Sequence, residues 1–160
     1  MPKQGSVALL QEPLALELLA AGIPAHLAYT WKDGTPRVVP MWFHWTGDAI
    51  AMVCPPDSSK LKVIKDGTPV TVSIDYEAWP ARLLSVRGTA TTQSIEGEAE
   101  FYDEMVRKYL GDGTDDWRAM YRKLCPTVVQ LIITPEWVSL IDVAHNRFPN
   151  ALEKAMAAAG

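Results

Sequence analysis

Residues 35–66 read TPRVVPMWFHWTGDAIAMVCPPDSSKLKVIKD and contain the pattern that decides the fold class. From residue 35 to residue 45, successive side chains alternate between two faces, as they do in a β-strand. Both faces are largely apolar, which is typical of a strand buried in a barrel or covered by a ligand or a partner chain. Pro40 lies in the middle and has no backbone N–H, so we expect an edge strand or a bulge there.

The segment after this strand contains the best candidate for an anion site. A second strand is predicted at residues 49–54, and Asp57, Ser58 and Ser59 then offer capping side chains for a helix of about two turns that begins near Lys60. Helix-start amides, hydroxyl groups and a lysine together favour an anion, most simply a phosphate. An ordinary capped helix with solvated lysines explains the same pattern without any ligand.

The rest of the periodicity predicts an antiparallel meander flanked by helices. Strands are expected at residues 25–31, 70–75, 82–92 and 127–141, the last with a kink at Pro135, and helices at 12–21, 96–110, 114–124 and 147–159. We expect a single domain over residues 1–160, with a barrel at 25–141, a helical insertion at 95–124 and a C-terminal tail at 142–160. The aromatic stripes of the insertion are expected to pack as core rather than to hold a cofactor.

Composition and charge argue against several classes of protein. With 160 residues, 48% of them hydrophobic and 21% charged, the chain has the composition of a folded globular domain. The net charge of −4 offers no general attraction to nucleic acid or to an anionic membrane, so any anion site must be local. The first residues lack the uninterrupted apolar core of a signal peptide, and no apolar run is long enough to span a bilayer. We therefore expect a soluble, cytoplasmic protein.

The sequence contains no recognisable metal or nucleophile motif. Cys54 and Cys125 fit no metal-ligand spacing, and two buried thiols are favoured over a disulfide. The histidines His26, His44 and His145 form no clustered motif, so we expect no metal. His44 lies on a strand face that can meet a bound ring, but a hydrogen-bonded structural role explains it equally well. Neither a nucleophile elbow nor a dinucleotide-binding or P-loop glycine pattern is present.

Five segments occur in an order that resembles the pyridoxamine 5'-phosphate oxidase-like FMN-binding split-barrel family. They are residues 37–42 (RVVPMW), 53–54 (VC), 58–60 (SSK), 69–74 (PVTVSI) and 85–90 (SVRGTA). The resemblance implies a mainly β, α+β fold built as an antiparallel six-stranded split β-barrel with flanking helices. It also implies a homodimer with FMN at the subunit interface. We expect the aromatic residues of the loop at 76–80 to contribute to that subunit contact.

The resemblance assigns cofactor-binding roles to three of these segments. The residues expected to contact FMN are Arg37, Val38, Val39, Pro40, Met41, Val53, Cys54, Ser58, Ser59 and Lys60. The 58–60 segment is expected to hold the phosphate, the backbone of residues 38–41 to meet the polar edge of the ring, and residues 53–54 to line its side. No catalytic residue is assigned, and no metal is implied.

Two arginines are isolated cations on otherwise apolar strands, and each needs a partner. An ordinary structural interpretation pairs Arg37 and Arg87 with carboxylates such as Asp75 or Glu77. A functional interpretation gives one arginine the flavin phosphate or the electron-rich edge of the ring, where positive charge stabilises the reduced anion. The family resemblance favours Arg37 for this role.

Departures from the family pattern determine which activity we expect. Trp42 stands where the vitamin-metabolising members carry a basic residue, Ser59 stands where they usually carry arginine, and residues 142–147 resemble their arginine-containing closing segment only in part. We therefore expect an FMN-dependent oxidoreductase that acts on a small organic substrate other than pyridoxamine phosphate. A deazaflavin-dependent reductase of the same fold and a non-catalytic flavin- or haem-binding protein are the alternatives.

Overall fold

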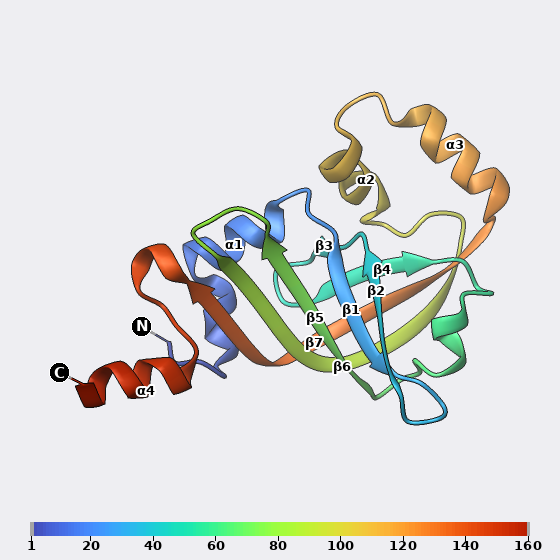
Figure 1. Cartoon of the computed structure of the whole chain (residues 1–160). Coiled ribbons are helices and arrows are strands. Elements are labelled where there is room, and N and C mark those ends of the chain that lie inside the picture. The colour runs from blue at the N-terminus through green and yellow to red at the C-terminus, as the bar shows by residue number, and fades with distance from the viewer. Residues whose placement is uncertain (1, 160) are drawn as a thin grey trace.

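Alternating apolar residues form a single antiparallel sheet in the computed structural model, which describes residues 2–159 (Figure 1). The seven strands are β1 (Ala25–Thr30), β2 (Pro36–Met41), β3 (His44–Trp45), β4 (Ile50–Cys54), β5 (Thr68–Tyr76), β6 (Arg82–Glu96) and β7 (Thr127–Asp142), in the order β2-β1-β5-β6-β7-β4-β3. The α-helices are α1 (Pro13–Ala20), α2 (Tyr102–Leu110), α3 (Asp115–Leu124) and α4 (Asn150–Ala159), and the 3₁₀ turns are η1 (Val7–Gln11), η2 (Ser59–Lys62) and η3 (Val143–His145).

The expected strand at residues 35–45 is divided, and its two parts form opposite edges of the sheet. β2 pairs with β1, β3 pairs with β4, and only Trp42 and Phe43 separate β2 from β3. The division occurs because the Phe43 side chain is fully buried and its backbone N–H donates to the Tyr109 hydroxyl rather than to a strand. The sheet therefore has seven strands instead of the predicted six, and no ladder closes it among residues 2–159.

Both predicted irregularities of the sheet are confirmed. β2 is an edge strand, which accommodates the missing N–H of Pro40. In the long β6–β7 pair, Arg87 lies opposite Trp137 and Gly88 opposite Pro135, so Glu136 is the extra residue of a β-bulge. A Cβ atom at Gly88 would overlap the carbonyl oxygen of Thr134, and only glycine fits this close approach.

The main core fills the concave side of the sheet and extends under the N-terminal segment. Its fully buried side chains include Leu27 of β1, Val72 of β5, Val86 of β6 and Leu131 of β7. The predicted N-terminal helix is confirmed as α1, which begins at its proline, packs against β3, β5 and β6, and buries three apolar residues of one face. This core positions the edge strand and the β4 end that carry the predicted site.

The helical insertion forms a smaller apolar cluster that packs beside β3 and β4 (Figure 1). β6 continues to Glu96 and α2 begins only at Tyr102, so the helix expected from residue 96 starts later than predicted. The core prediction is confirmed for α2, but it is wrong for α3, which has no buried residue. Trp117 is 37% exposed and Leu124 is 69% exposed, and the ring contacts of α3 with other elements are those of Tyr121 with Tyr102 and of Trp117 with Trp42.

Other features of the described chain refine the sequence-based predictions. Cys54 is buried as expected, whereas Cys125 is only partly buried, and both are free thiols. The predicted tail helix forms as α4, whose described side chains are all exposed. Within residues 2–159, no helix combines the length and apolar character needed to cross a bilayer.

Candidate functional site

The predicted ring-binding segment, residues 37–41, forms most of the edge strand β2. Val38 is 63% exposed and Pro40 is also exposed, while Val39 and Met41 pack against the main core. The described strands include one partner for β2, namely β1, so the opposite edge of β2 has backbone groups without a ladder. This edge offers an exposed apolar surface and free peptide groups to a ligand or a second chain.

The structure corrects the partners proposed for the two arginines. The guanidinium of Arg37 lies 4.0 Å from the Asp33 carboxylate and 5.7 Å from the centre of the Trp31 ring, near the β1–β2 turn. Arg87 lies over the ring of Trp137, with Cζ 4.1 Å from the ring centre. Neither arginine pairs with Asp75 or Glu77 within residues 2–159, since Arg37 lies near Asp33 of the β1–β2 turn and Arg87 lies over Trp137 of β7.

Three of the predicted phosphate- and ring-binding residues meet at the end of β4. Burial raises the pKa of the Cys54 thiol, while the nearby Lys60 ammonium and a hydrogen bond from the Ser58 hydroxyl oppose that rise. The Ser58 backbone N–H donates to the Pro55 carbonyl oxygen at 3.0 Å, so a tight turn brings Ser58 back toward the end of β4. The structure thus brings together Cys54, Ser58 and Lys60, although they come from a strand, a loop and a 3₁₀ turn.

The predicted two-turn helix at Lys60 is wrong. η2 is a single 3₁₀ turn, and the Ser58 side chain makes no capping hydrogen bond to it. The turn ends early because the Thr68 hydroxyl accepts a hydrogen bond from the Lys65 backbone N–H at 2.8 Å and redirects the chain into β5. A turn this short has little dipole, so attraction for an anion rests on hydroxyl and ammonium groups.

A hollow of about 430 Å³ lies beside η2, and its lining has two lysines against one aspartate, a net positive charge. Asp57, Ser58, Lys62 and Lys65 line it together with polar residues of β6, whereas Ser59 and Lys60 do not. None of the lysines 60, 62 and 65 forms an ion pair with a carboxylate in the described part of the chain. Local positive charge is therefore available to an anion, despite the negative net charge of the chain.

Val53 does not line an open groove in the single chain. It packs against the apolar cluster of the insertion, formed by Ala99, Tyr102, Met105 and Val106. Sequence periodicity indicated that these helical residues pack as core, but it gave no sign that they cover the predicted cofactor-binding strand. The insertion therefore lies against one of the surfaces that the family resemblance assigned to the cofactor.

An aromatic contact attaches the insertion to the junction between β2 and β3. The rings of Trp42 and Tyr109 stack with centroids 4.8 Å apart and an interplanar angle of 4°. The Tyr109 hydroxyl accepts from Phe43 N and donates to Ile23 O, each at 3.2 Å. Burial raises the pKa of Tyr109 to about 12, so the hydroxyl remains a donor at neutral pH. Sequence analysis missed this contact because its residues are far apart in the chain.

Lys108 is a partly buried lysine with a lowered pKa, and sequence analysis missed it as well. Its Nζ lies 3.4 Å from the centre of the Phe43 ring and donates to the Leu19 carbonyl oxygen at 3.3 Å. Burial lowers the pKa of Lys108 to about 7. Its spacing on an amphipathic helix resembles that of any solvated lysine, so no sequence signal distinguishes it.

The histidines show no arrangement typical of a metal site. His44 lies 3.7 Å from Glu104 and stacks on Phe101, and burial lowers the pKa of its ring, which supports the structural interpretation. His26 lies 3.5 Å from Asp75, and both line a hollow of about 580 Å³ that also includes Pro40. Across residues 2–159, no group of three or more potential ligands is positioned to hold a metal ion.

Comparison with known proteins gives structural matches only. The sequence matches no protein-family model and no curated protein. An F420 reductase aligns with a TM-score of 0.59 at 26% identity, covering 77% of this chain and 94% of that chain. An FAD- and haem-binding protein from Mycobacterium smegmatis aligns with a TM-score of 0.62 at 20% identity, covering 99% of this chain and 81% of that chain. A candidate pyridoxamine 5'-phosphate oxidase from Listeria innocua aligns with a TM-score of 0.54 at 18% identity, covering 79% of this chain and 94% of that chain.

These neighbours include the family that the sequence resembles, and they agree with the open antiparallel sheet described above. The chain has the pyridoxamine 5'-phosphate oxidase-like fold. Two of the three alignments lie at or below 20% identity, so they establish the split-barrel fold and no more. The roles of the ten predicted site residues in this split-barrel protein remain predictions.

Proposed function

We propose that this split-barrel protein binds FMN and acts as an oxidoreductase on a small organic substrate. The observation that supports this most is the tight turn that places Ser58 and the short turn η2, with Lys60, directly after β4, next to lysines without carboxylate partners in the described chain. The names of the structural neighbours, which include a reductase of a deazaflavin and an FAD-binding protein, support a flavin-type cofactor.

The proposed phosphate site consists of Ser58, Ser59 and Lys60. An ammonium and two hydroxyl groups can each donate to a phosphate oxygen, and hydrogen bonds to a charged acceptor are the stronger kind. Lys60 is partly buried, so its interaction with an anion is less screened than that of a fully exposed lysine. The side chains thereby replace the helix dipole that the short turn η2 lacks.

The proposed ring site lies along the free edge of β2. Peptide groups of residues 38–41 face the polar edge of the ring there, and the exposed Val38 side chain offers an apolar contact. Arg37 supplies positive charge, because its 4.0 Å contact with Asp33 is loose and half exposed and so can be exchanged for a ligand. When bound, the flavin supplies hydride and electron transfer, and the protein contributes binding, orientation and exclusion of water.

We propose that two copies of the chain complete this site. The β2 edge and the exposed Val38 present apolar surface to solvent in the single chain. A free strand edge with apolar side chains is a typical docking surface. In such a homodimer the cofactor lies in the groove between the subunits, where the second copy covers the ring.

A specific observation favours a second candidate, a deazaflavin-dependent reductase. The alignment with an F420 reductase has the highest sequence identity of the three described above, at 26%. The hollow beside η2 also places Lys62 and Lys65 next to Ser58, which suits an anionic group longer than a single phosphate. The two candidates share the fold and differ in the cofactor.

Cofactor titration of the purified full-length protein tests the proposal. We expect FMN to bind with saturation and to bind more tightly than deazaflavin, and Lys60→Ala to weaken FMN binding by about 1 to 3 kcal/mol, because a charged donor to the phosphate is lost. Lys154→Ala, on the exposed helix α4, is the matched control and should leave the affinity unchanged. Isothermal titration calorimetry and flavin fluorescence quenching measure the affinities of the unmodified protein and of the two variants.

The outcomes separate the candidates. Tighter binding of deazaflavin, together with its reduction by a hydride donor, replaces the first candidate by the second. Binding of neither cofactor contradicts both, and flavin binding with no turnover of any reductant indicates a binding protein. Sedimentation equilibrium measures the dimer, and a monomer at the cofactor-saturated state contradicts the shared site.

A further inference from the structure

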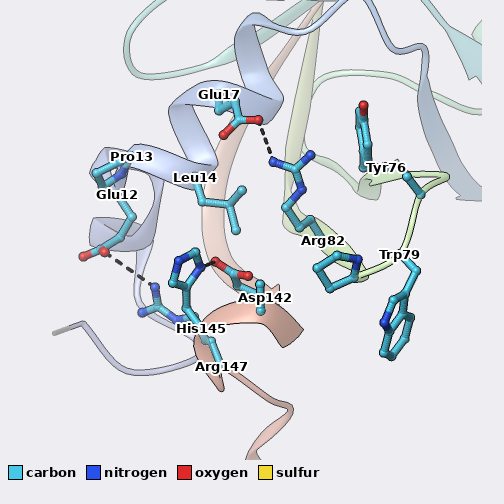
Figure 2. A pocket seen from close by; sticks show the side chains of 13 residues that line it. Glu12, Pro13, Leu14, Glu17, Tyr76, Trp79, Arg82, Asp142, His145 and Arg147 are labelled. Atoms are coloured by element: carbon cyan, nitrogen blue, oxygen red, sulfur yellow. Dashed lines mark hydrogen bonds and ion pairs between the residues drawn. The ribbon is translucent and has the colours of Figure 1, made fainter.

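A separate hollow of about 490 Å³ lies where the start of β6 meets the end of β7 (Figure 2). Its walls come from α1, the loop after β5, β6, and the turn that follows β7. The lining residues are Glu12, Pro13, Leu14, Glu17, Tyr76, Ala78, Trp79, Pro80, Arg82, Asp142, Ala144, His145 and Arg147. None of the ten residues predicted to contact FMN lines it. Its volume is in the range of small-molecule sites in proteins.

Asp142 provides an unsatisfied acceptor in this hollow. The residue is 7% exposed, and its Oδ2 lies 2.7 Å from Nδ1 of His145. Its Oδ1 is buried and has no hydrogen-bond partner within residues 2–159. Figure 2 shows the carboxylate next to the His145 ring and below Leu14, among the residues that line the hollow. A buried carboxylate oxygen without a donor is costly, and a ligand N–H that reached it would remove that cost.

The charges around the hollow favour a cation. The Arg82 guanidinium is 2.6 Å from Glu17, and the Arg147 guanidinium is 3.5 Å from Glu12. Both guanidinium groups are thus already paired, and the Arg147 group also donates to the Pro2 carbonyl oxygen. Asp142 is the remaining charge, which leaves one net negative charge on the lining when His145 is neutral. An incoming anion would face this charge, whereas an incoming cation would neutralise it.

The other walls suit a flat apolar body. Trp79 is 81% exposed and Tyr76 is 43% exposed, and both lie across the hollow from Pro13 and Leu14. The Tyr76 ring already holds a cation on its face, since Arg82 Cζ lies 4.4 Å from the ring centre. An exposed indole is an unusual surface feature, and it offers the stacking face that best accommodates aromatic and cationic groups.

We propose that this hollow binds a small flat cation, an aromatic ring bearing an amidinium or ammonium group, whose N–H donates to Oδ1 of Asp142. Trp79 stacks on the ring, and Leu14 packs against its edge. Because Oδ1 is buried, a ligand reaches it only when a neighbouring side chain moves, and the 83% exposed side chain of His145, held to Oδ2 by a single hydrogen bond, can do so.

Calorimetric titration of the full chain at neutral pH with three probes of one shape tests the proposal. Benzamidine carries the charge and the donors, benzamide the donors alone, and benzoate the opposite charge. We expect saturable one-to-one binding of benzamidine, weaker binding of benzamide, and benzoate binding at least about tenfold weaker than benzamidine, because only the cation neutralises Asp142.

Substitutions locate the site. Asp142→Asn should weaken benzamidine binding by about tenfold or more, since a charge-assisted hydrogen bond is lost. Trp79→Ala should also weaken binding, and this variant keeps the fold because the indole is exposed. Asp116→Asn, on the exposed side of α3, is the matched control and should bind like the unmodified protein.

Three results would each overturn the proposal: no saturable binding of benzamidine, benzoate binding as tightly as benzamidine, or an affinity that neither Asp142→Asn nor Trp79→Ala lowers. If Asp142→Asn does not fold, Trp79→Ala decides alone. FMN affinity is measured in parallel, and because the hollow shares no residue with the predicted cofactor site, each result stands whatever cofactor the protein binds.

Discussion

The barrel core and the helical insertion are held together by different interactions. The core of the sheet is a continuous set of buried, mostly aliphatic side chains from several strands, such as Leu27, Val86 and Leu131. The insertion has only a small buried cluster around Val106, and its other contacts include stacked rings, the Tyr109 hydroxyl bonds and ion pairs of Arg118.

This difference indicates that the insertion is the less stable part. Apolar burial scales with the area removed from water, whereas partly exposed ion pairs contribute little and are screened by salt. Regions with few buried contacts open at lower free energy than the core does. Because the insertion packs on Val53, its opening would uncover a predicted cofactor-binding residue without unfolding the sheet.

The largest expected effect separates the two regions directly. Leu131→Ala should lower the free energy of unfolding by about 2 to 5 kcal/mol, because it leaves a cavity in the fully buried core. Its counterpart Val106→Ala should mainly raise the hydrogen exchange of α2 and α3. Denaturant titration measures the free energy of unfolding of both variants, and amide hydrogen exchange measures the local opening of α2 and α3. If both variants lower the global transition equally, the sheet and the insertion form one cooperative unit.

A smaller effect is expected where the insertion joins the barrel. Tyr109→Phe removes the acceptor of Phe43 N–H and the donor to Ile23 O, which should cost about 1 to 2 kcal/mol. Urea denaturation followed by tryptophan fluorescence reports both stability and the environment of Trp42. Tyr76→Phe, with an exposed ring, is the control. An unchanged midpoint for Tyr109→Phe would mean that the hydroxyl bonds do not anchor the insertion.

Lys108 makes the stability of this junction depend on pH. Its pKa in the folded protein is about 7, below the ordinary 10.5, so between these values the folded state binds fewer protons than the unfolded state. The free energy of unfolding should therefore rise with pH over this window, by less than about 1 kcal/mol per pH unit after solvent screening.

Comparison with Lys108→Met isolates this contribution, because all other titrating groups are shared. Between pH 7.0 and 8.5, the stability of the unmodified protein should rise more steeply than that of the variant. Guanidinium chloride titrations at several pH values measure both slopes. Parallel slopes would show that the buried ammonium does not titrate in this range.

The smallest expected effect concerns the ion pairs within the insertion. Arg118 lies 2.6 Å from Glu98 and 2.8 Å from Asp103, and these side chains are partly exposed. Arg118→Met should lower the free energy of unfolding by about 0.5 to 1 kcal/mol at low salt. At about 0.5 M salt the loss should be smaller, because salt already screens these ion pairs in the unmodified protein. Arg122→Met, whose side chain is 54% exposed, is the control. Hydrogen exchange of the backbone amides at the two salt concentrations measures the effect. If salt changes the exchange of β-sheet amides instead of insertion amides, the division into a stable sheet and a less stable insertion is contradicted.

Strand alternation and the chemistry of single residues predicted much of the fold. Pro40 indicated an edge because proline has no N–H to donate, and the Pro135 region indicated a kink that the bulge confirms. The same reasoning placed Ser58 and Lys60 near the end of β4. It failed at η2 and α3, where patterns typical of a capped helix and a buried helix occur in a short turn and on an exposed surface.

The sequence by itself determined the local features: the strands, the helix α1, the edge at Pro40 and the positive charge near Ser58. These follow from side-chain periodicity and backbone stereochemistry, which act over a few residues. Only the tertiary structure decided that the 35–45 strand divides at Phe43, that α2 covers Val53, and that Asp142 faces α1 with an unpaired oxygen. These features depend on how the sheet curls and brings distant residues into contact, which no local pattern encodes.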